Sequence, residues 1–212
     1  MRINIVGGTG YTGANIASVA ATRGHQVTSF SRNLPPEQIP GVTYRTGSVF
    51  DDDFLRESVS DADVVVLATS PRGELEDVQV DLYSKYAGLA AAAGVRLFVI
   101  GGYSALRPEP GAARIAEADV PAAYAKEIRS GVDNLETLLA APESLDWVYV
   151  SPAGGYGSFA PGEATGHYRK GGEVALVDDN GDSMISGADF ALGVVDAIEE
   201  GTDHRAHISF AY

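Results

Sequence analysis

The sequence contains no cysteine, which excludes disulfide bonds and catalysis by a thiol. Basic residues are scarce as well, because 15 Lys and Arg stand against 29 Asp and Glu and give a formal net charge of −14. A nucleic-acid-binding surface needs a basic stripe, and the sequence shows none, so we expect no nucleic-acid partner. An anionic ligand must therefore be held locally, by backbone N–H groups and a few well-placed cations.

Long apolar runs are also missing. The most apolar stretches, 64–68 and 90–95, fall far short of the about 20 residues that a membrane-spanning helix needs. The first expected strand begins at residue 2, which leaves no room for the charged and apolar regions of a secretory signal. We therefore expect a cytoplasmic protein with no membrane partner.

The chain does contain a regular alternation of strand and helix patterns. Its 212 residues, 45% of them hydrophobic, suit one α/β domain, and no repeat or linker divides them. The alternation predicts a Rossmann-like, doubly wound parallel sheet. We predict a single domain over 1–212, in which 152–186 and 204–212 form a small annex on the substrate side. After a first strand that starts at residue 2, the expected strands span 26–31, 42–46, 62–69, 96–101, 146–151, 173–177 and 206–212, and the expected helices span 11–23, 51–59, 74–93, 122–141 and 187–200.

The first strand runs into a glycine-rich turn, RINIVGGTGYTG, which begins at residue 2. Gly8, Gly10 and Gly13 match the dinucleotide fingerprint GxGxxG, and Gly7 adds the spacing GxxGxxG. A side chain here would block the turn, keep the backbone from the pyrophosphate and hold the helix off the strand. The helix start then offers free N–H groups and a positive dipole end to phosphates, although a turn that binds nothing is the alternative. The predicted cofactor-binding residues of the turn are Gly7, Thr9, Gly10, Tyr11, Thr12 and Gly13.

The end of the second strand indicates which dinucleotide the site holds. An NAD site places a carboxylate there for the ribose hydroxyls, whereas an NADP site places an arginine. The sequence offers Ser31, Arg32 and Asn33 and no acid, and an arginine fork pairs strongly with a 2′-phosphate. We therefore predict NADP as the cofactor, with NAD as the second choice and an ordinary solvated arginine as the alternative.

Later strand ends are expected to line the rest of the site. Ligands of such sheets bind beyond the carboxyl ends of the strands, at the switch in strand order. Taken singly, each of these positions is equally well an ordinary strand-to-loop turn. The predicted residues are Ala68, Thr69 and Ser70 after the fourth strand, Gly101 and Gly102 after the fifth, and Ser151 and Pro152 after the sixth.

Motifs of several enzyme classes are absent. The Tyr-x-x-x-Lys pair of ordinary short-chain dehydrogenases is not rebuilt, since Tyr124 is followed by Lys126 and residues two apart on a helix do not face each other. No GxxxxGK[ST] loop indicates a nucleotide hydrolase, and Ser104 lacks the second glycine of a nucleophile elbow. The four histidines form no metal set, and we predict no metal. Ser104 and Tyr124 remain the candidate catalytic residues near the reacting group.

Together these residues resemble the atypical short-chain dehydrogenase/reductases with an NmrA-like or biliverdin reductase B-like domain. They resemble more closely the bacterial group named as NADH-flavin reductases, and the resemblance covers the whole chain. Its N-terminal marks are residues 7–13, 23–27 and 31–33, and its C-terminal marks are 145–147, 150–152, 161–163, 185–186, Asp189 and 208–212. Residues 165–169, Thr-Gly-His-Tyr-Arg, look like the family's Thr-Gly-x-Tyr-Arg.

The resemblance implies binding of NADPH or NADH and transfer of hydride to a flavin, a quinone or a similar conjugated acceptor. Orientation of the nicotinamide beside such an acceptor suffices, because solvent protonates the product. Many relatives carry Gly-Asp-Val after the third strand, with the aspartate at the adenine. Here Ser48 stands in that place beside Val49, so we predict both residues at the cofactor and leave the adenine contact open.

Residues 152–172 are rich in glycine and predict a loop with at most short strands. The aromatic side chains of Tyr156, Phe159 and Tyr168 either stack on a flat acceptor or simply pack within this loop. Two functions compete with the reductase: an NmrA-like redox sensor that binds NADP without catalysis, and an NAD(P)-dependent epimerase. The expected partner is a small molecule, and the chain is expected to be a monomer or a homodimer.

Overall fold

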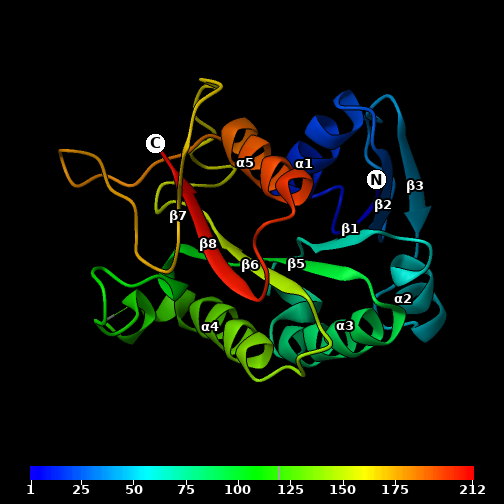
Figure 1. Ribbon diagram of the computed structural model, residues 1–212, viewed down its shortest axis with the longest axis horizontal. Coiled ribbons are helices and arrows are strands. Elements are labelled where there is room, and N and C mark those ends of the chain that lie inside the picture. Colours follow the sequence, from blue (N-terminus) through cyan, green and yellow to red (C-terminus); the bar gives the residue numbers. More distant parts are fainter. Residues whose placement is uncertain (119) are drawn as a thin grey trace.

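The computed structural model describes residues 1–118 and 120–212 and shows an eight-stranded sheet between two layers of helices (Figure 1). Strands and helices alternate along most of the chain, as the sequence predicts. The strands are β1 (Arg2–Val6), β2 (Gln26–Ser31), β3 (Val42–Thr46), β4 (Val64–Leu67), β5 (Arg96–Ile100), β6 (Trp147–Ser151), β7 (Arg169–Gly171) and β8 (Ala206–Ala211). The α-helices are α1 (Tyr11–Thr22), α2 (Asp52–Val59), α3 (Gln79–Ala93), α4 (Ala125–Leu139) and α5 (Gly187–Glu200).

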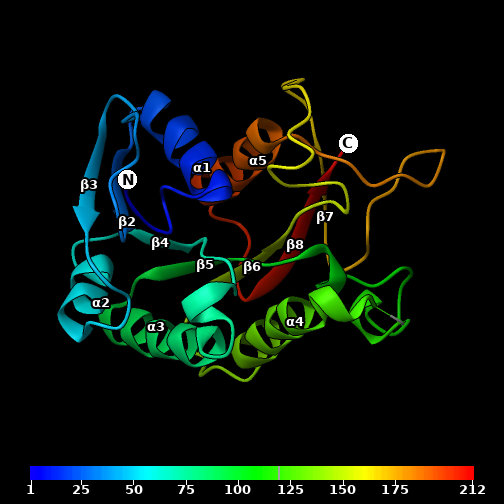
Figure 2. The same cartoon turned by 180° about the vertical axis from the view of Figure 1, so that it is seen from behind.

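The strand order is β3-β2-β1-β4-β5-β6-β8-β7. All neighbouring pairs are parallel except β7 and β8, which pair antiparallel at the edge. The chain builds outward from β1 through β2 to β3, and then returns to the other side of β1 with β4 (Figure 2). This reversal is the topological switch point of a Rossmann-like sheet, so the predicted doubly wound fold is confirmed.

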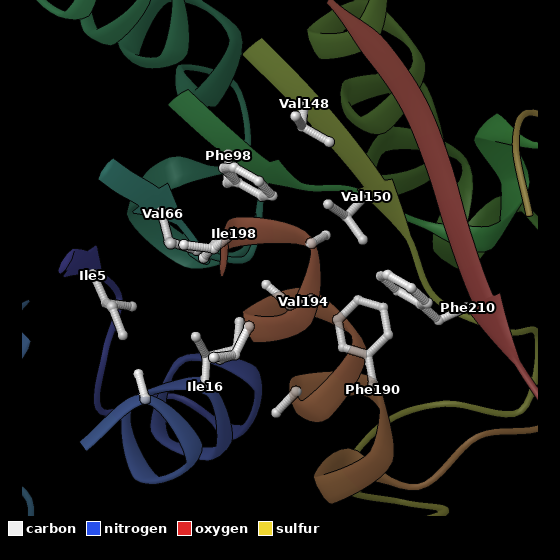
Figure 3. Packing of buried hydrophobic residues seen from close by; sticks show 14 of the residues in the cluster. Ile5, Ile16, Val66, Phe98, Val148, Val150, Phe190, Val194, Ile198 and Phe210 are labelled. Carbon is white, nitrogen blue, oxygen red and sulfur yellow. The ribbon is translucent and has the colours of Figure 1, made fainter. Parts of the chain in front are cut away.

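Helices cover both faces of the sheet, with α1 and α5 on one face and α2, α3 and α4 on the other (Figures 1 and 2). In β4, Val64 and Val66 join the apolar cluster under α1 and α5, while Val65 and Leu67 join the cluster on the opposite face. Burial on both faces explains why this strand is apolar throughout. Figure 3 shows the first cluster, where Val66, Phe98, Val148 and Val150 of the strands face Ile16, Phe190, Val194 and Ile198 of the helices.

The acidic run at 51–53 begins a helix, as expected. Asp51 is the N-cap of α2, and its carboxylate accepts a hydrogen bond of 2.8 Å from the backbone N–H of Asp53. The cap satisfies an N–H group that has no partner inside the helix. The carboxylates also lie at the positive end of the helix dipole, which accounts for the clustering of acids there.

Two expected helices start later than their sequence patterns predict. The 3₁₀ turn η1 (Gly73–Leu75), in which Gly73 takes a left-handed backbone (φ +61°), precedes α3, and the α-helix itself starts at Gln79. Another 3₁₀ turn, η4 (Ala122–Tyr124), precedes α4 in the same way. Two residues of η1, Glu74 and Leu75, line the same cavity as residues 68–70 after β4.

The strand expected at 173–177 is wrong. The backbone there bonds a different loop, since Arg107 N–H donates to the Glu173 carbonyl (2.8 Å) and Ala175 N–H donates to the Arg107 carbonyl (2.9 Å). The edge of β8 is instead covered by β7, which lies inside the stretch expected to be mainly loop. Residues 152–186 therefore form a loop segment with one short strand between β6 and α5 (Figure 1). Their role as a substrate-side annex, together with 204–212, stays a prediction.

No helix among the described residues combines the length and the apolar character needed to cross a membrane. The cytoplasmic location expected from the sequence stays a prediction.

Candidate functional site

A pocket of about 350 Å³ lies at the switch point, where β1, β2, β3 and β4 end. The carboxyl ends of parallel strands meet at one edge of the sheet, so residues far apart in the sequence are gathered there. Part of the predicted site is brought together in this way. The predicted residues that line the pocket are Gly7, Thr9, Gly10, Ser31, Arg32, Asn33, Ser48, Val49, Ala68, Thr69 and Ser70.

The glycine turn has the shape that a phosphate cradle requires. Gly7 has a left-handed backbone (φ +83°), and a Cβ atom there would lie 2.8 Å from the carbonyl oxygen of Ala68. At Gly13, a Cβ atom would lie 2.3 Å from the carbonyl oxygen of Gly7, so a side chain would push α1 away from the turn. The first turn of α1 also has no side-chain cap at its N-cap residue, Gly10. Its N–H groups therefore remain suited to an anion, and the turn fits a dinucleotide pyrophosphate.

The first two residues of α1, Tyr11 and Thr12, form hydrogen bonds with the loop after β6. The Thr12 hydroxyl lies 2.7 Å from the Tyr156 hydroxyl, and the Tyr11 hydroxyl donates to the Pro161 carbonyl oxygen at 3.4 Å. Tyr11, Thr12 and Gly13 are not among the residues that line the pocket. Their assignment as cofactor-binding residues stays a prediction.

A buried polar network fixes the end of β4. Gln79 donates to the carbonyl oxygen of Thr69 (2.7 Å), and Asn134 donates to the side-chain oxygen of Gln79 (2.9 Å). The hydroxyls of Thr69 and Tyr83 lie 2.9 Å apart, and burial raises the pKa of Tyr83 to about 12. The tyrosine is therefore neutral and serves to hold the strand end. Sequence reasoning missed Gln79 and Asn134, whose one signal is a polar residue on the buried face of a helix.

Arg32 lines the pocket next to a carboxylate, that of Glu74, which is distant from it in the sequence. Its guanidinium lies 2.9 Å from the carboxylate of Glu74, and both side chains are exposed, by 70% and 66%. Glu74 lines the same pocket from η1, 42 positions along the chain. No short pattern could indicate it, because the sheet order brings β2 and the segment after β4 to one edge. Arg72 also lines the pocket and forms two hydrogen bonds with Glu127, at 2.9 and 3.0 Å.

The predicted residues after β5 and β6 lie outside this pocket and have a structural task. Ser151 is fully buried, and its hydroxyl donates to the Gly102 carbonyl oxygen at 2.9 Å. Burial, with help from the charge of Arg114, lowers the pKa of His207 to about 4, so the ring is neutral at pH 7. Because the Ser151 hydroxyl gives its one proton to Gly102, it accepts at His207, and the neutral ring carries its proton on Nε2, 2.9 Å away. Ser151 thus holds the 101–102 turn in place. Gly101, Gly102, Ser151 and Pro152 stay predictions as cofactor-binding residues.

The two catalytic candidates are not among the residues that line the pocket. Ser104 lies in η2 (Tyr103–Ala105), the 3₁₀ turn after β5, and Tyr124 is 55% exposed at the start of α4. Lys126 pairs with Asp77 at 3.0 Å and with Glu76 at 3.3 Å. The lysine is therefore committed to carboxylates, and the roles of Ser104 and Tyr124 stay predictions.

Two of the three loop aromatics are committed to packing. The Tyr156 ring lies 4.6 Å from that of Phe190, and the Tyr168 ring lies 5.1 Å from that of Phe210. Phe159 is 80% exposed. The packing alternative therefore holds for Tyr156 and Tyr168, and Phe159 alone of the three offers an open face.

Comparison with known proteins agrees with this geometry. YwnB, an uncharacterized protein of Bacillus subtilis (strain 168), is 32% identical over 203 residues, which cover 94% of this chain and 92% of YwnB. A Burkholderia pseudomallei structure named "putative exported protein" is 34% identical, with a TM-score of 0.87 and 100% of both chains covered. A Streptococcus pneumoniae TIGR4 structure named "putative NADH-flavin reductase" is 27% identical, with a TM-score of 0.85 and coverage of 100% and 99%.

The resemblance predicted from the sequence is confirmed. A family model described as NAD(P)H-binding matches residues 7–201, which include the glycine turn, Arg32 and the whole pocket. With the fold and the cradle in agreement, the chain belongs to the NAD(P)H-binding family.

Proposed function

We propose that the protein is an NAD(P)H-dependent reductase that prefers NADPH and reduces a flat, conjugated acceptor of the flavin or quinone type. The observation that carries the proposal is the pocket at the switch point, where the glycine turn and Arg32 line one cavity. The resemblance to the Streptococcus protein named for flavin reduction supports the acceptor class.

The chain's own residues would bind and orient the dinucleotide. Backbone N–H groups of the turn and of the first turn of α1 would hold the pyrophosphate, and Arg32 would hold the 2′-phosphate. The strand end at 68–70, fixed through Thr69 by Gln79 and Tyr83, would support the ribose on the nicotinamide side. When bound, the cofactor supplies a hydride from its nicotinamide ring.

The arrangement of Tyr124 and Lys126 favours an acceptor that needs no tyrosine acid. The lysine that would lower a tyrosine pKa in a short-chain dehydrogenase is paired with Asp77 and Glu76 instead. A flavin or quinone accepts hydride into a conjugated system, and solvent can protonate the product. Orientation beside the nicotinamide then supplies most of the rate enhancement.

A direct assay tests the reaction. Purified protein is mixed with NADPH and FMN, and absorbance of the reduced nicotinamide is followed against a protein-free control. We expect consumption of NADPH that scales with protein concentration. Tight NADPH binding without turnover on FMN or on a soluble quinone would overturn the reductase. That outcome would favour the second candidate, a sensor that binds the cofactor without catalysis. The observation that favours a sensor is that Ser104 and Tyr124 are not among the residues that line the pocket.

A variant tests the cofactor preference. Arg32→Ala should weaken NADPH binding by about tenfold to a hundredfold and NADH binding by much less, because only NADPH carries the phosphate that the fork would contact. Arg129→Ala is the matched control, since Arg129 is also exposed (80%, against 70% for Arg32) and pairs with Asp133 on α4. Equal loss for both cofactors in Arg32→Ala would show that the arginine does not contact the 2′-phosphate.

A further inference from the structure

The pocket contains charges of both signs. Arg32, Arg72 and Glu74 are its charged lining residues within the described chain. Arg72 is bonded through two nitrogens to Glu127, which leaves Arg32 as the fork that faces Glu74. The carboxylate oxygen lies 2.9 Å from the guanidinium nitrogen, within normal reach of a charge-assisted hydrogen bond.

The Glu74 side chain is 66% exposed and is not held by packing. It sits in the 3₁₀ turn η1, after Gly73, where the left-handed backbone meets no neighbouring atom within 4 Å of a Cβ position. In the described part of the chain, its side chain bonds to Arg32 and to no other side chain. The carboxylate is thus free to leave the arginine or to turn to a ligand at the same position.

We propose that Glu74 sets the cofactor preference by competing with the 2′-phosphate for Arg32, an inference that rests on the dinucleotide site proposed above. A 2′-phosphate that binds Arg32 must displace the Glu74 carboxylate from the guanidinium and then lie close to that negative charge. Both effects weaken the binding of NADPH. NADH presents a ribose hydroxyl at the same place, and a carboxylate accepts a hydrogen bond from it. Arg32 therefore favours NADPH while Glu74 favours NADH, so Glu74 reduces the preference for NADPH that Arg32 provides.

The test uses two nucleotides that differ by one group. 2′,5′-ADP and 5′-AMP are titrated by calorimetry into the wild type and into Glu74→Gln, which keeps the side-chain length and removes the charge. Both ligands lack the nicotinamide, so the readout is independent of turnover. We expect Glu74→Gln to raise the affinity ratio of 2′,5′-ADP over 5′-AMP by about threefold to tenfold, the range for loss of one exposed charge interaction with a multivalent anion.

The control is Glu76→Gln, two residues away. Glu76 pairs with Lys126 at 3.3 Å and does not line the pocket, so the same change of net charge should leave the ratio unchanged. An unchanged ratio in Glu74→Gln, with both nucleotides bound, overturns the competition and leaves the dinucleotide site standing. Failure of the wild type to bind either nucleotide overturns the proposed site, and the inference falls with it.

Discussion

The pocket at the end of β1 is lined by glycines, by strand ends and by exposed charged side chains, whereas the cluster around Asp189 at the start of α5 is closed and built from side chains. In the Asp189 cluster, one carboxylate that is 2% exposed accepts hydrogen bonds from several donors. The donors are the backbone N–H groups of Thr165 (2.7 Å) and Gly166 (2.9 Å), and the hydroxyls of Thr165 (3.0 Å), Ser186 (3.0 Å) and Tyr212 (2.6 Å).

The two regions differ in where their hydrogen-bonding groups find partners. An anion-binding turn must leave its N–H groups free for a ligand, so glycine and an uncapped helix are its working parts. A buried carboxylate must have its hydrogen bonds satisfied inside the protein, so the Asp189 cluster joins the 165–166 turn, the start of α5 and the C-terminus. The two regions thus differ in what their residues do: the glycine turn leaves its N–H groups free for a ligand, and the Asp189 cluster satisfies its own hydrogen bonds and holds a loop in place.

The largest effect should come from Asp189→Ala. Removal of the carboxylate leaves buried N–H and hydroxyl groups without a partner, and we expect a loss of about 3 to 5 kcal/mol in the free energy of unfolding. Urea denaturation followed by circular dichroism measures it. Asp179→Ala, at an exposed position of the 172–186 segment, is the control and should change stability by less than about 0.5 kcal/mol. A loss as small as that of Asp179→Ala would mean that the Asp189 hydrogen bonds do not stabilise the fold.

The glycine turn should respond in binding as well as in stability. Gly7→Ala puts a Cβ atom 2.8 Å from the Ala68 carbonyl oxygen on a left-handed backbone, so we expect about 2 kcal/mol of destabilisation and at least about tenfold weaker NADPH binding. Gly88→Ala is the matched control, because Gly88 lies in α3 with nothing within 4 Å of its Cβ position. There the helix should gain about 0.5 to 1 kcal/mol with binding unchanged. If the folded Gly7→Ala variant bound NADPH as tightly as the wild type, the glycine turn would not be the site that holds the cofactor.

The parts of the fold that the sequence predicts are those with local causes. Apolar runs such as that of β4 mark strands covered on both faces, and the glycine spacing marks the strand-to-helix turn at Gly7. Once a parallel sheet is predicted, the gathering of its strand ends follows, and so does much of the pocket lining. The expected strand at 173–177 is wrong because pairing partners decide strands, and the backbone of Glu173 bonds Arg107 instead.

The missed parts of the site have causes that are distant in the sequence. Glu74 reaches Arg32 from a turn that follows a different strand, and Asn134 reaches the end of β4 through Gln79. The position of each depends on the packing of whole elements, which no spacing of nearby residues encodes. Tyr156 is a case in which the sequence leaves two alternatives open, because an aromatic residue in a glycine-rich loop can stack on a ligand or pack inside the protein. In the structure its ring packs against Phe190.

The pH dependence of the free energy of unfolding tests the Asp189 cluster separately. Burial acts to raise the pKa of Asp189, but the hydrogen bonds from Thr165, Tyr212 and Gly166 outweigh it and lower the pKa from 3.8 to about 2. A depressed pKa stabilises the fold above pH 3.8, and this contribution, roughly 2 kcal/mol, is lost as pH falls through 2. The free energy of unfolding of the wild type should therefore fall between pH 4 and pH 2 by more than that of Asp189→Asn. Parallel curves for the two proteins would contradict the assignment.

The smallest effect should come from the hydrogen bond between the hydroxyls of Thr12, in the first turn of α1, and Tyr156, in the loop after β6. Tyr156 is largely shielded from solvent, its hydroxyl lies 2.7 Å from that of Thr12, and its ring packs on Phe190. Tyr156→Phe keeps the ring and removes the hydroxyl, so we expect a loss of about 1 kcal/mol in stability and NADPH affinity within about twofold of the wild type. The small change in affinity follows because the cradle is made of backbone N–H groups, which this side chain does not contact. A tenfold loss of NADPH affinity, measured by fluorescence titration in the folded variant, would instead show that the loop orders the cradle and that the two regions work as one.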